Sequence, residues 1–200
     1  MLDGRPVWLA ASTHPGEEDA AASVHRRLRE RHPQILTIIV PRHPARAAEI
    51  MKTLHAGGLT VVRRSDDPAR LDAEIYLADT MGELGLFYRL SPIAFVGGSL
   101  AAHGGHNPLE AAQLGCAVLY GPDMTNFQAV AEALEAQGGA RRCADIDALG
   151  HTVGLLLTDE AARGAQSAAA KAVAEANRSV VDRVYAALVP HLDRIGEKTR

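Results

Sequence analysis

Apolar runs and amphipathic stretches alternate along most of the chain. The apolar runs are continuous, as in strands that are covered on both faces of a parallel sheet. Between them, apolar residues recur at steps of three and four, which is typical of helices with one buried face. Strands are predicted at 6–11, 35–40, 59–62, 74–78, 93–96, 117–120 and 141–143. Helices are predicted from 17 to 31, around 50–54, at 82–90, from 108, at 126–137 and from 145 onward.

This alternation of strands and helices predicts an α/β fold with a doubly wound, mostly parallel sheet. In such sheets the carboxyl ends of the strands meet at one edge, and ligands bind beyond that edge. Four segments that follow predicted strands are therefore expected to lie together. They are 12–16, 41–43, 80–83 and 97–110.

Residues 93–110 combine a predicted strand with glycines and a helix start. Glycine pairs at 97–98 and 104–105 allow sharp turns and the close approach of a ligand to the backbone. Asn107 can cap the helix that Pro108 begins. A helix that starts beside glycines presents free N–H groups and the positive end of its dipole, so this stretch predicts an anion site.

Glu110 follows about one turn into this helix. Its carboxylate can accept hydrogen bonds from vicinal sugar hydroxyls, and phosphate together with ribose indicates a nucleotide. The alternative is that the glycines only make tight turns and that Glu110 only favours the first helical turn. Four glycines followed by Asn, Pro and Glu, after a buried-type strand, are harder to explain by turns alone.

Composition excludes several classes of function. The formal charge of −3 provides no general basic field for nucleic acid. Cys116 and Cys143 are too few for a disulfide scaffold or a cysteine metal site, which indicates a reducing, cytosolic setting. No apolar run approaches the roughly 20 residues that span a bilayer, and the start of the chain leads straight into a strand rather than into a signal peptide.

From residue 145 the chain becomes alanine-rich and helical. One helix face is apolar, and it is formed by Val173, Ala176, Val180, Val184 and Leu188. This face either packs on the sheet of this chain or partly packs on something that the chain does not contain. The length of 200 residues suits one large domain. We expect it to span residues 1–190, followed by a charged, loosely ordered tail at 191–200.

Five segments within residues 6–143 form a specific combination, although each alone is weak. They read Ala-Ser-Thr-His-Pro-Gly-Glu-Glu at 11–18, Pro-Arg-His-Pro at 41–44, Asp-Thr-Met-Gly-Glu-Leu at 79–84, Val-Gly-Gly-Ser-Leu at 96–100 and Gly-Gly-His-Asn-Pro-Leu-Glu at 104–110. In this order they resemble the C-terminal domain of the Kdo transferases. These enzymes move 3-deoxy-D-manno-octulosonic acid (Kdo) from CMP-Kdo onto lipid A precursors in lipopolysaccharide biosynthesis.

The resemblance implies the Rossmann-like, donor-binding C-terminal half of a GT-B type glycosyltransferase, whose N-terminal half binds the acceptor. The family's CMP contacts carry over onto Pro41, Arg42, Met81, Gly82, Glu83, Asn107, Pro108, Leu109 and Glu110. The donor sugar or phosphate is assigned to Ser12, Thr13, Gly16, Gly104, Gly105 and His106. Arg42 can offer a forked pair of donors to the phosphate or to the Kdo carboxylate.

The resemblance also implies partners and a location. CMP-Kdo or CMP is the expected ligand, a lipid A precursor would bind through an N-terminal domain, and neither a cofactor nor a metal is required. The family's catalytic base and membrane anchor have no counterpart in this sequence, so we expect a fragment that binds nucleotide without turnover. The parent enzyme is expected at the cytoplasmic face of the bacterial inner membrane, and this fragment is expected to be soluble and cytoplasmic.

Simpler roles remain open for several of these residues. Arg42 can be a solvated loop arginine, Glu83 can only favour a helix start, and His14 and His43 can be orienting or structural groups. The pair at 103 and 106 suggests a metal site, but no third ligand follows at helical spacing, so we expect none. For the whole chain, the alternatives are a stand-alone nucleotide-binding module and a UDP-sugar epimerase or transferase of related architecture. A dehydrogenase is least expected, because no Gly-x-Gly-x-x-Gly follows the first strand.

Overall fold

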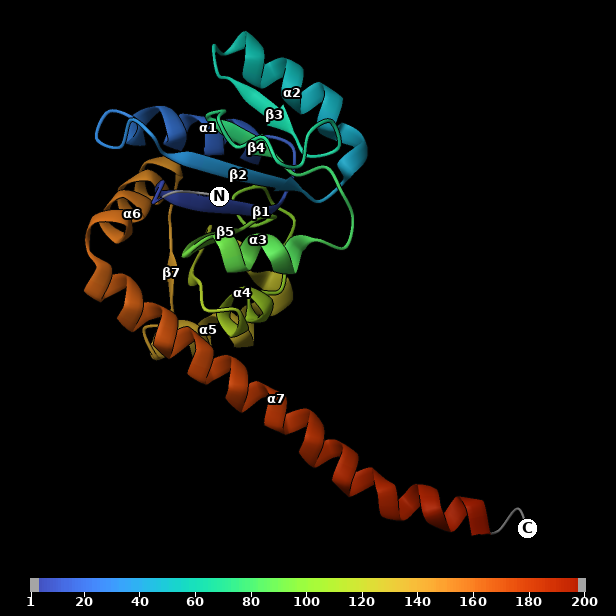
Figure 1. The fold of residues 1–200 in the computed structure, drawn as a ribbon. Helices are drawn as coiled ribbons and strands as arrows, with labels where there is room; N and C mark the ends of the chain where they lie inside the picture. Colours follow the sequence, from blue (N-terminus) through green and yellow to red (C-terminus); the bar gives the residue numbers. More distant parts are fainter. Residues whose placement is uncertain (1–3, 198–200) are drawn as a thin grey trace.

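The computed structural model describes residues 4–197 of the chain, apart from the side chains of 179–188 and 190–197. Seven strands lie within the described residues, and they are β1 (Val7–Thr13), β2 (Leu36–Pro41), β3 (Val61–Arg63), β4 (Ile75–Leu77), β5 (Ile93–Val96), β6 (Ala117–Tyr120) and β7 (Ala140–Arg142). They form one sheet in the order β3-β4-β2-β1-β5-β6-β7, and all neighbouring pairs are parallel. The prediction of a doubly wound parallel sheet is confirmed (Figure 1).

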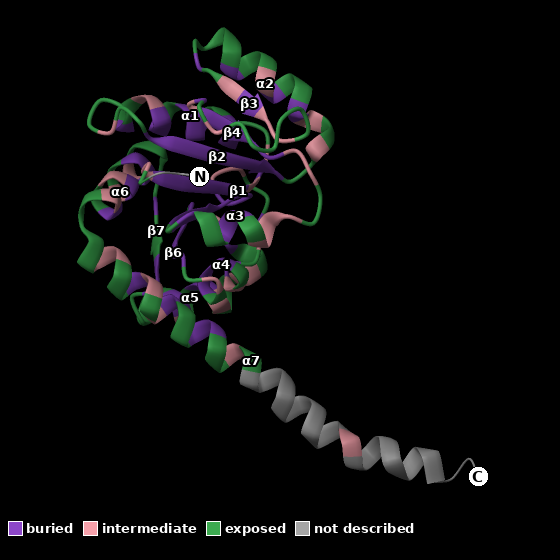
Figure 2. Ribbon diagram, in the orientation of Figure 1, coloured by how far each residue is buried: buried purple, intermediate pink, exposed green. Residues whose placement is uncertain are grey.

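Helices cover both faces of this sheet. They are α1 (Glu17–Leu28), α2 (Ala47–Ala56), α3 (Leu84–Leu90), α4 (Leu109–Gln113), α5 (Gln128–Ala136), α6 (Ile146–Thr158) and α7 (Glu160–Glu197), with short 3-10 helices η1 (Pro44–Arg46) and η2 (Thr125–Phe127). The apolar side chains of α1, α2 and α6 pack on one face, and those of α3, α4, α5 and the start of α7 pack on the other. Figure 2 shows the central strands buried between these two layers.

Strand β1 explains why the apolar runs of the sequence do not alternate with polar residues. Trp8 and Ala10 contribute to the core on the side of α1, while Val7, Leu9 and Ala11 contribute to the core on the side of α3 and α4. Successive side chains of a strand point to opposite faces, so a central strand with both faces covered needs apolar residues at every position.

The end of β1 is irregular, and the irregularity lies next to the expected site. Ala11 pairs with Val40, but Thr13 pairs with Pro41, so Ser12 is an extra residue in β1. Ser12 has a φ of 55°, which is uncommon for a residue other than glycine. A bulge of this kind re-aims the side chains that follow it, and it turns Thr13 into the interior, where it is fully buried.

The C-terminal helix continues further than the sequence indicates. Helix α7 includes residues 191–197, where the sequence predicts a loosely ordered tail; 198–200 lie outside the described residues. Of the predicted apolar face, Val173 is buried against the sheet. The side chains of Val180, Val184 and Leu188 lie outside the described part of the chain. The division of the chain at residue 190 stays a prediction.

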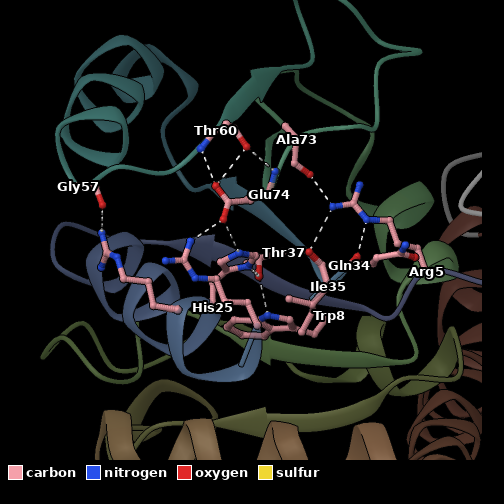
Figure 3. Close-up of polar contacts among 12 residues, drawn as sticks. Arg5, Trp8, His25, Gln34, Ile35, Thr37, Gly57, Thr60, Ala73 and Glu74 are labelled. Carbon is pink, nitrogen blue, oxygen red and sulfur yellow. Dashed lines mark hydrogen bonds and ion pairs between the residues drawn. The ribbon is translucent and has the colours of Figure 1, made fainter. Parts of the chain in front are cut away.

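A buried polar network joins α1 to the sheet (Figure 3). Trp8 Nε1 donates to Thr37 Oγ1 over 2.7 Å, and His25 Nδ1 lies 2.8 Å from the same hydroxyl. His25 Nε2 lies 3.8 Å from Glu74 Oε1, which is beyond hydrogen-bond distance. Burial, which outweighs the attraction of Glu74, lowers the pKa of His25 from 6.5 to about 4. His25 is therefore uncharged in the folded protein near neutral pH.

This histidine predicts a loss of stability in mild acid. Below its ordinary pKa of 6.5, His25 takes up a proton in the unfolded chain but not in the folded protein until about pH 4. The contribution of His25 is thus present above pH 6.5 and is lost as the pH falls from 6.5 to 4. Between pH 7 and pH 5 it should lower the free energy of unfolding by about 2 kcal/mol, as measured by urea denaturation at both pH values.

The matched variants are His25→Gln, which removes the titration, and His55→Gln, which replaces an exposed histidine of α2. The decrease between pH 7 and pH 5 should be about 2 kcal/mol smaller in His25→Gln and unchanged in His55→Gln. An undiminished decrease in His25→Gln would contradict the assignment.

Candidate functional site

The loops at the carboxyl edge of the sheet converge where the strand order reverses, between β1 and β5. Two backbone hydrogen bonds join the strand ends there. The N–H of Gly97 donates to the carbonyl of Ala11 over 2.8 Å, and the N–H of Arg42 donates to the carbonyl of Thr13 over 2.9 Å. The loops after β1, β2 and β5 therefore lie together, as the sequence predicts.

The side chain of Glu17, at the start of α1, occupies the first glycine loop. Its carboxylate accepts hydrogen bonds from the backbone N–H groups of Gly98, Ser99 and Leu100 at 2.7, 3.0 and 3.0 Å, and from that of Ala101 at 3.5 Å. It also accepts one from the N–H of His14 at 2.9 Å, and Glu17 is only 2% exposed. Successive N–H groups of this kind form an anion-binding concavity, and here the anion is a side chain of the protein itself.

The second glycine pair also has its N–H groups in use. The N–H of Gly104 donates to Asp123 Oδ2 over 2.8 Å. The N–H groups of Gly105 and His106 donate to the carbonyls of Gly98 and Gly97, over 2.8 and 3.1 Å. The expectation of free backbone donors at 104–106 is therefore wrong, because the folded loop satisfies them internally. A β-carbon on Gly104 would collide with the side chain of Asn126, so this glycine serves the packing of two loops.

Four histidines gather over these loops, and we call them the histidine cluster: His14, His43, His103 and His106. Nε2 of His14 lies 2.9 Å from Nε2 of His106, and their rings are within 16° of parallel. The ring of His103 stacks on that of His14 with centroids 4.1 Å apart, and the ring of His43 meets it edge-on at 5.9 Å. The sequence predicts that the loops after β1, β2 and β5 meet, and the fold shows that the rings of these histidines contact one another there.

Burial and neighbouring groups lower the pKa of both central histidines. The pKa of His14 is lowered by burial first and by His103 next, although Glu17 opposes the shift. The pKa of His106 is lowered by burial, by His14 and by Arg42. Arg42 is exposed and precedes His43 of the cluster, and its backbone N–H donates to the carbonyl of Thr13, next to His14.

Of the predicted CMP contacts, Glu110 in α4 lies close to Gly85 at the start of α3. Glu110 is exposed, and its Oε1 lies 3.6 Å from the position that a β-carbon on Gly85 would take. Asn107 Oδ1 accepts a hydrogen bond from the N–H of Leu109, the first residue of α4, over 3.0 Å, although Pro108 rather than Asn107 occupies the N-cap position. This helix has only five residues. Pro41 and Pro108 are buried beneath these groups, and Leu109 is half-buried.

Glu83 is already engaged by the protein. Its carboxylate accepts hydrogen bonds from Arg64 at 2.5 and 2.7 Å and from the hydroxyl of Thr80. The hydrogen bonds from Arg64 and Thr80 lower the pKa of Glu83 to about 2. Next to it, Met81 is 74% exposed and Gly82 has a φ of 80° with open space around it. Met81 and Gly82 are thus free to face a ligand, whereas the carboxylate of Glu83 fixes the loop.

Three residues of the loop after β1 are assigned from the sequence to the donor sugar or phosphate, and they differ in burial. Ser12 is half-buried, and Gly16 is exposed, with a φ of 92°. Thr13 is fully buried, and its hydroxyl donates to Glu18 Oε1 over 2.9 Å. The assignment of Thr13 to a donor sugar is therefore wrong, because the bulge at Ser12 turns its side chain inward.

Metal-binding groups and membrane-spanning helices are both absent from the described part of the chain. Among these residues, no group of three or more His, Cys, Asp or Glu side chains is arranged to hold a metal ion. Over the same residues, none of the helices combines the length and apolar character needed to cross a membrane.

Comparison with known proteins places the chain among transferases. The 3-deoxy-D-manno-octulosonic acid transferase of Haemophilus influenzae is 38% identical over 192 residues, which are 95% of this chain and 45% of that protein. The chain thus spans less than half the length of this relative. No protein-family model matches the chain.

Two solved structures resemble this chain, one in both sequence and fold and the other in fold alone. The C-terminal CMP-Kdo binding domain of WaaA from Acinetobacter baumannii is 33% identical, with a TM-score of 0.81, over 86% of this chain and 90% of that one. A protein from Listeria monocytogenes, described as a putative UDP-N-acetylglucosamine 2-epimerase, has a TM-score of 0.58 over 96% of this chain and 46% of that one. At 16% identity it shares the fold alone. The chain belongs to the 3-deoxy-D-manno-octulosonic acid transferase family, in which it corresponds to the C-terminal domain.

Proposed function

We propose that this chain is the donor-binding domain of a glycosyltransferase that transfers Kdo from CMP-Kdo to a lipid A precursor. The main support is the match over 90% of a solved domain that is described as CMP-Kdo binding. The convergence of Arg42, the histidine cluster and the loops at 81–83 and 107–110 at one edge of the sheet is consistent with it. Acceptor binding and attachment to the inner membrane would belong to parts of the protein outside this chain.

The proposed chemistry assigns binding and charge stabilisation to this domain. Transfer breaks the bond between the anomeric carbon of Kdo and a phosphate oxygen of CMP, so negative charge grows on the departing phosphate. Donors placed where this charge develops lower the barrier. The guanidinium of Arg42 can provide a forked pair of such donors, while Glu110 accepts hydrogen bonds from the ribose hydroxyls. The base that activates the acceptor would lie outside this chain, so the domain alone would bind nucleotide without turnover.

Two substitutions test the placement of the nucleotide. Arg42→Ala and Glu110→Ala should each weaken binding of CMP about 10- to 100-fold, since each removes hydrogen bonds made by a charged group. Both side chains are exposed, so the melting temperature without ligand should not change. Isothermal titration calorimetry gives the affinities. Matched controls are Arg31→Ala and Glu30→Ala, which replace exposed residues beyond the far end of α1. Normal CMP affinity in Arg42→Ala and Glu110→Ala would contradict the site.

The choice of nucleotide tests the function. The melting temperature of the wild-type chain should rise with CMP and CDP, but not with UDP or NAD. Stabilisation by UDP without stabilisation by cytidine nucleotides would contradict the proposal. In that case, turnover of UDP-N-acetylglucosamine would identify an epimerase, the alternative that shares this fold.

A further inference from the structure

In the two glycine-containing loops at this edge, the backbone N–H groups of 98–101 and 104–106 are already bonded within the protein, which leaves side chains as donors to an anion there. Glu17 holds the N–H groups of residues 98–101. Those of 104–106 are bonded to Asp123 and to two backbone carbonyls. The helix that follows has only five residues, too few for a strong dipole. A phosphate or carboxylate would therefore be held by guanidinium and imidazole groups.

The charges around the histidine cluster favour an anion. Arg42 and the four histidines contribute the groups that carry or can take up positive charge. The nearest carboxylates on the packed elements are Glu17 and Glu18, and both are buried and engaged. Glu17 binds the loop at 98–101, and Glu18 binds Arg46 Nη1 at 2.8 Å as well as Thr13. Beyond His103, Asp123 accepts hydrogen bonds from Gly104 and Thr125.

The contact between His14 and His106 restricts their protons. At 2.9 Å between the two Nε2 atoms, one nitrogen carries the hydrogen and the other accepts it. The Nδ1 atoms remain as the second donor or acceptor of each ring. A further proton on the pair goes to the free Nδ1 of the donating ring, which becomes a cation, and a bound anion favours that charged form. The pair can therefore bind an anion and a proton together.

We propose that His14 and His106, beside Arg42, form the oxyanion subsite of the donor site and that the pair takes up a proton when the anion binds. This inference rests on the proposed function, because it names the chemistry that holds the phosphate or the sugar carboxylate of the donor. The lowered pKa of both histidines in the free protein provides the capacity for proton uptake. A site of backbone N–H groups would bind the same anion without taking up protons.

The experiment uses ligands that do not titrate near neutral pH. The methyl ester of CMP carries one fixed phosphate charge, free Kdo carries one fixed carboxylate charge, and cytidine carries neither. Affinities are measured by calorimetry at pH 6 and pH 8, and at pH 7 in two buffers of different ionisation enthalpy, which together give the number of protons taken up. The affinity for the anion that contacts the pair should fall about tenfold from pH 6 to pH 8. The affinity for cytidine should be the same at pH 6 and pH 8.

Three variants test whether His14 and His106, rather than other histidines, take up the proton. His14→Gln and His106→Gln keep hydrogen-bonding groups but cannot be charged, so each should reduce the proton uptake and flatten the pH dependence. His55→Gln, which replaces an exposed histidine of α2, should leave both unchanged. Proton uptake with the CMP methyl ester assigns the pair to the phosphate, and uptake with free Kdo assigns it to the carboxylate.

Two failures are distinguishable. If the CMP methyl ester binds with the same affinity at pH 6 and pH 8 and neither anion is bound with proton uptake, the inference is overturned and the proposed function stands. If neither CMP nor its methyl ester binds the wild-type chain, the proposed function fails and the inference fails with it.

Discussion

Replacing Glu17 with alanine should lower the free energy of unfolding by about 3–5 kcal/mol, the scale on which loss of one partner from a buried charged network destabilises a protein. The substitution leaves the buried N–H groups of Gly98 and Ser99 without an acceptor. Each unsatisfied group costs about 1–3 kcal/mol. Urea denaturation of the wild-type and variant chains measures the difference.

Two further variants test whether Glu17 stabilises the protein by binding the loop at 98–101 or only as an acidic residue in the first turn of α1. Asp19→Ala removes an exposed carboxylate from the same first turn of α1, and it should cost no more than about 1 kcal/mol. Glu17→Gln keeps one acceptor oxygen but turns an amide donor toward the N–H groups, so its stability should lie between those of wild type and Glu17→Ala. Equal effects of Asp19→Ala and Glu17→Ala would show that the carboxylate does not hold the loop.

Replacing Gly97 with alanine should cost about 3 kcal/mol, the upper range for forcing atoms into a packed interior. A β-carbon at this position would lie 2.6 Å from the carbonyl oxygen of Ser12, 2.8 Å from that of Ala11 and 2.8 Å from Glu17 Oε2. Two of these atoms belong to the backbone at the end of β1, the middle strand of the sheet, which has no room to withdraw. The melting temperature and urea midpoint report the loss.

Gly138→Ala is the informative control for this substitution. Gly138 has a φ of 71°, which alanine adopts with strain, but open space surrounds it. Its replacement should cost only about 1 kcal/mol. Backbone conformation alone would predict the opposite order, because Gly97 does not need a positive φ. A larger loss in Gly138→Ala than in Gly97→Ala would contradict the packing argument.

The fold follows from the sequence to a large degree because its strands are buried on both faces. The continuous apolar run at 93–96 and the β-branched run at 35–40 are recognisable without any knowledge of their neighbours. A parallel sheet then places every following loop at one edge, which is why Arg42 and the loop at 97–110 were expected together. The sequence also predicts a helix after Asn107, but the helix begins at Leu109 with Pro108 as its N-cap and has only five residues.

The hydrogen-bond partners within the site were not predictable from local patterns. Glu17 reads as an acidic residue of a first helical turn, yet it binds N–H groups more than eighty residues away. From the sequence, Thr13 is expected to expose its hydroxyl in a surface loop. In the structure, the bulge at Ser12 turns the side chain of Thr13 into the interior. The meeting of the three loops follows from the parallel sheet, but the stacking of the His14, His103 and His106 rings depends on side-chain orientations that no spacing in the sequence encodes. Short-range signals identify where a site lies, while the long-range contacts decide which of its groups are free.

The carboxylate of Glu17 also makes the donor site preorganised. Because residues 98–101 are held by a part of the chain itself, they lose little conformational freedom when a ligand arrives. Ordering a flexible loop normally subtracts from the free energy of association. In this domain that entropic cost is met during folding, so the proposed donor would meet a preformed loop, and the proposed proton uptake would be confined to imidazole groups.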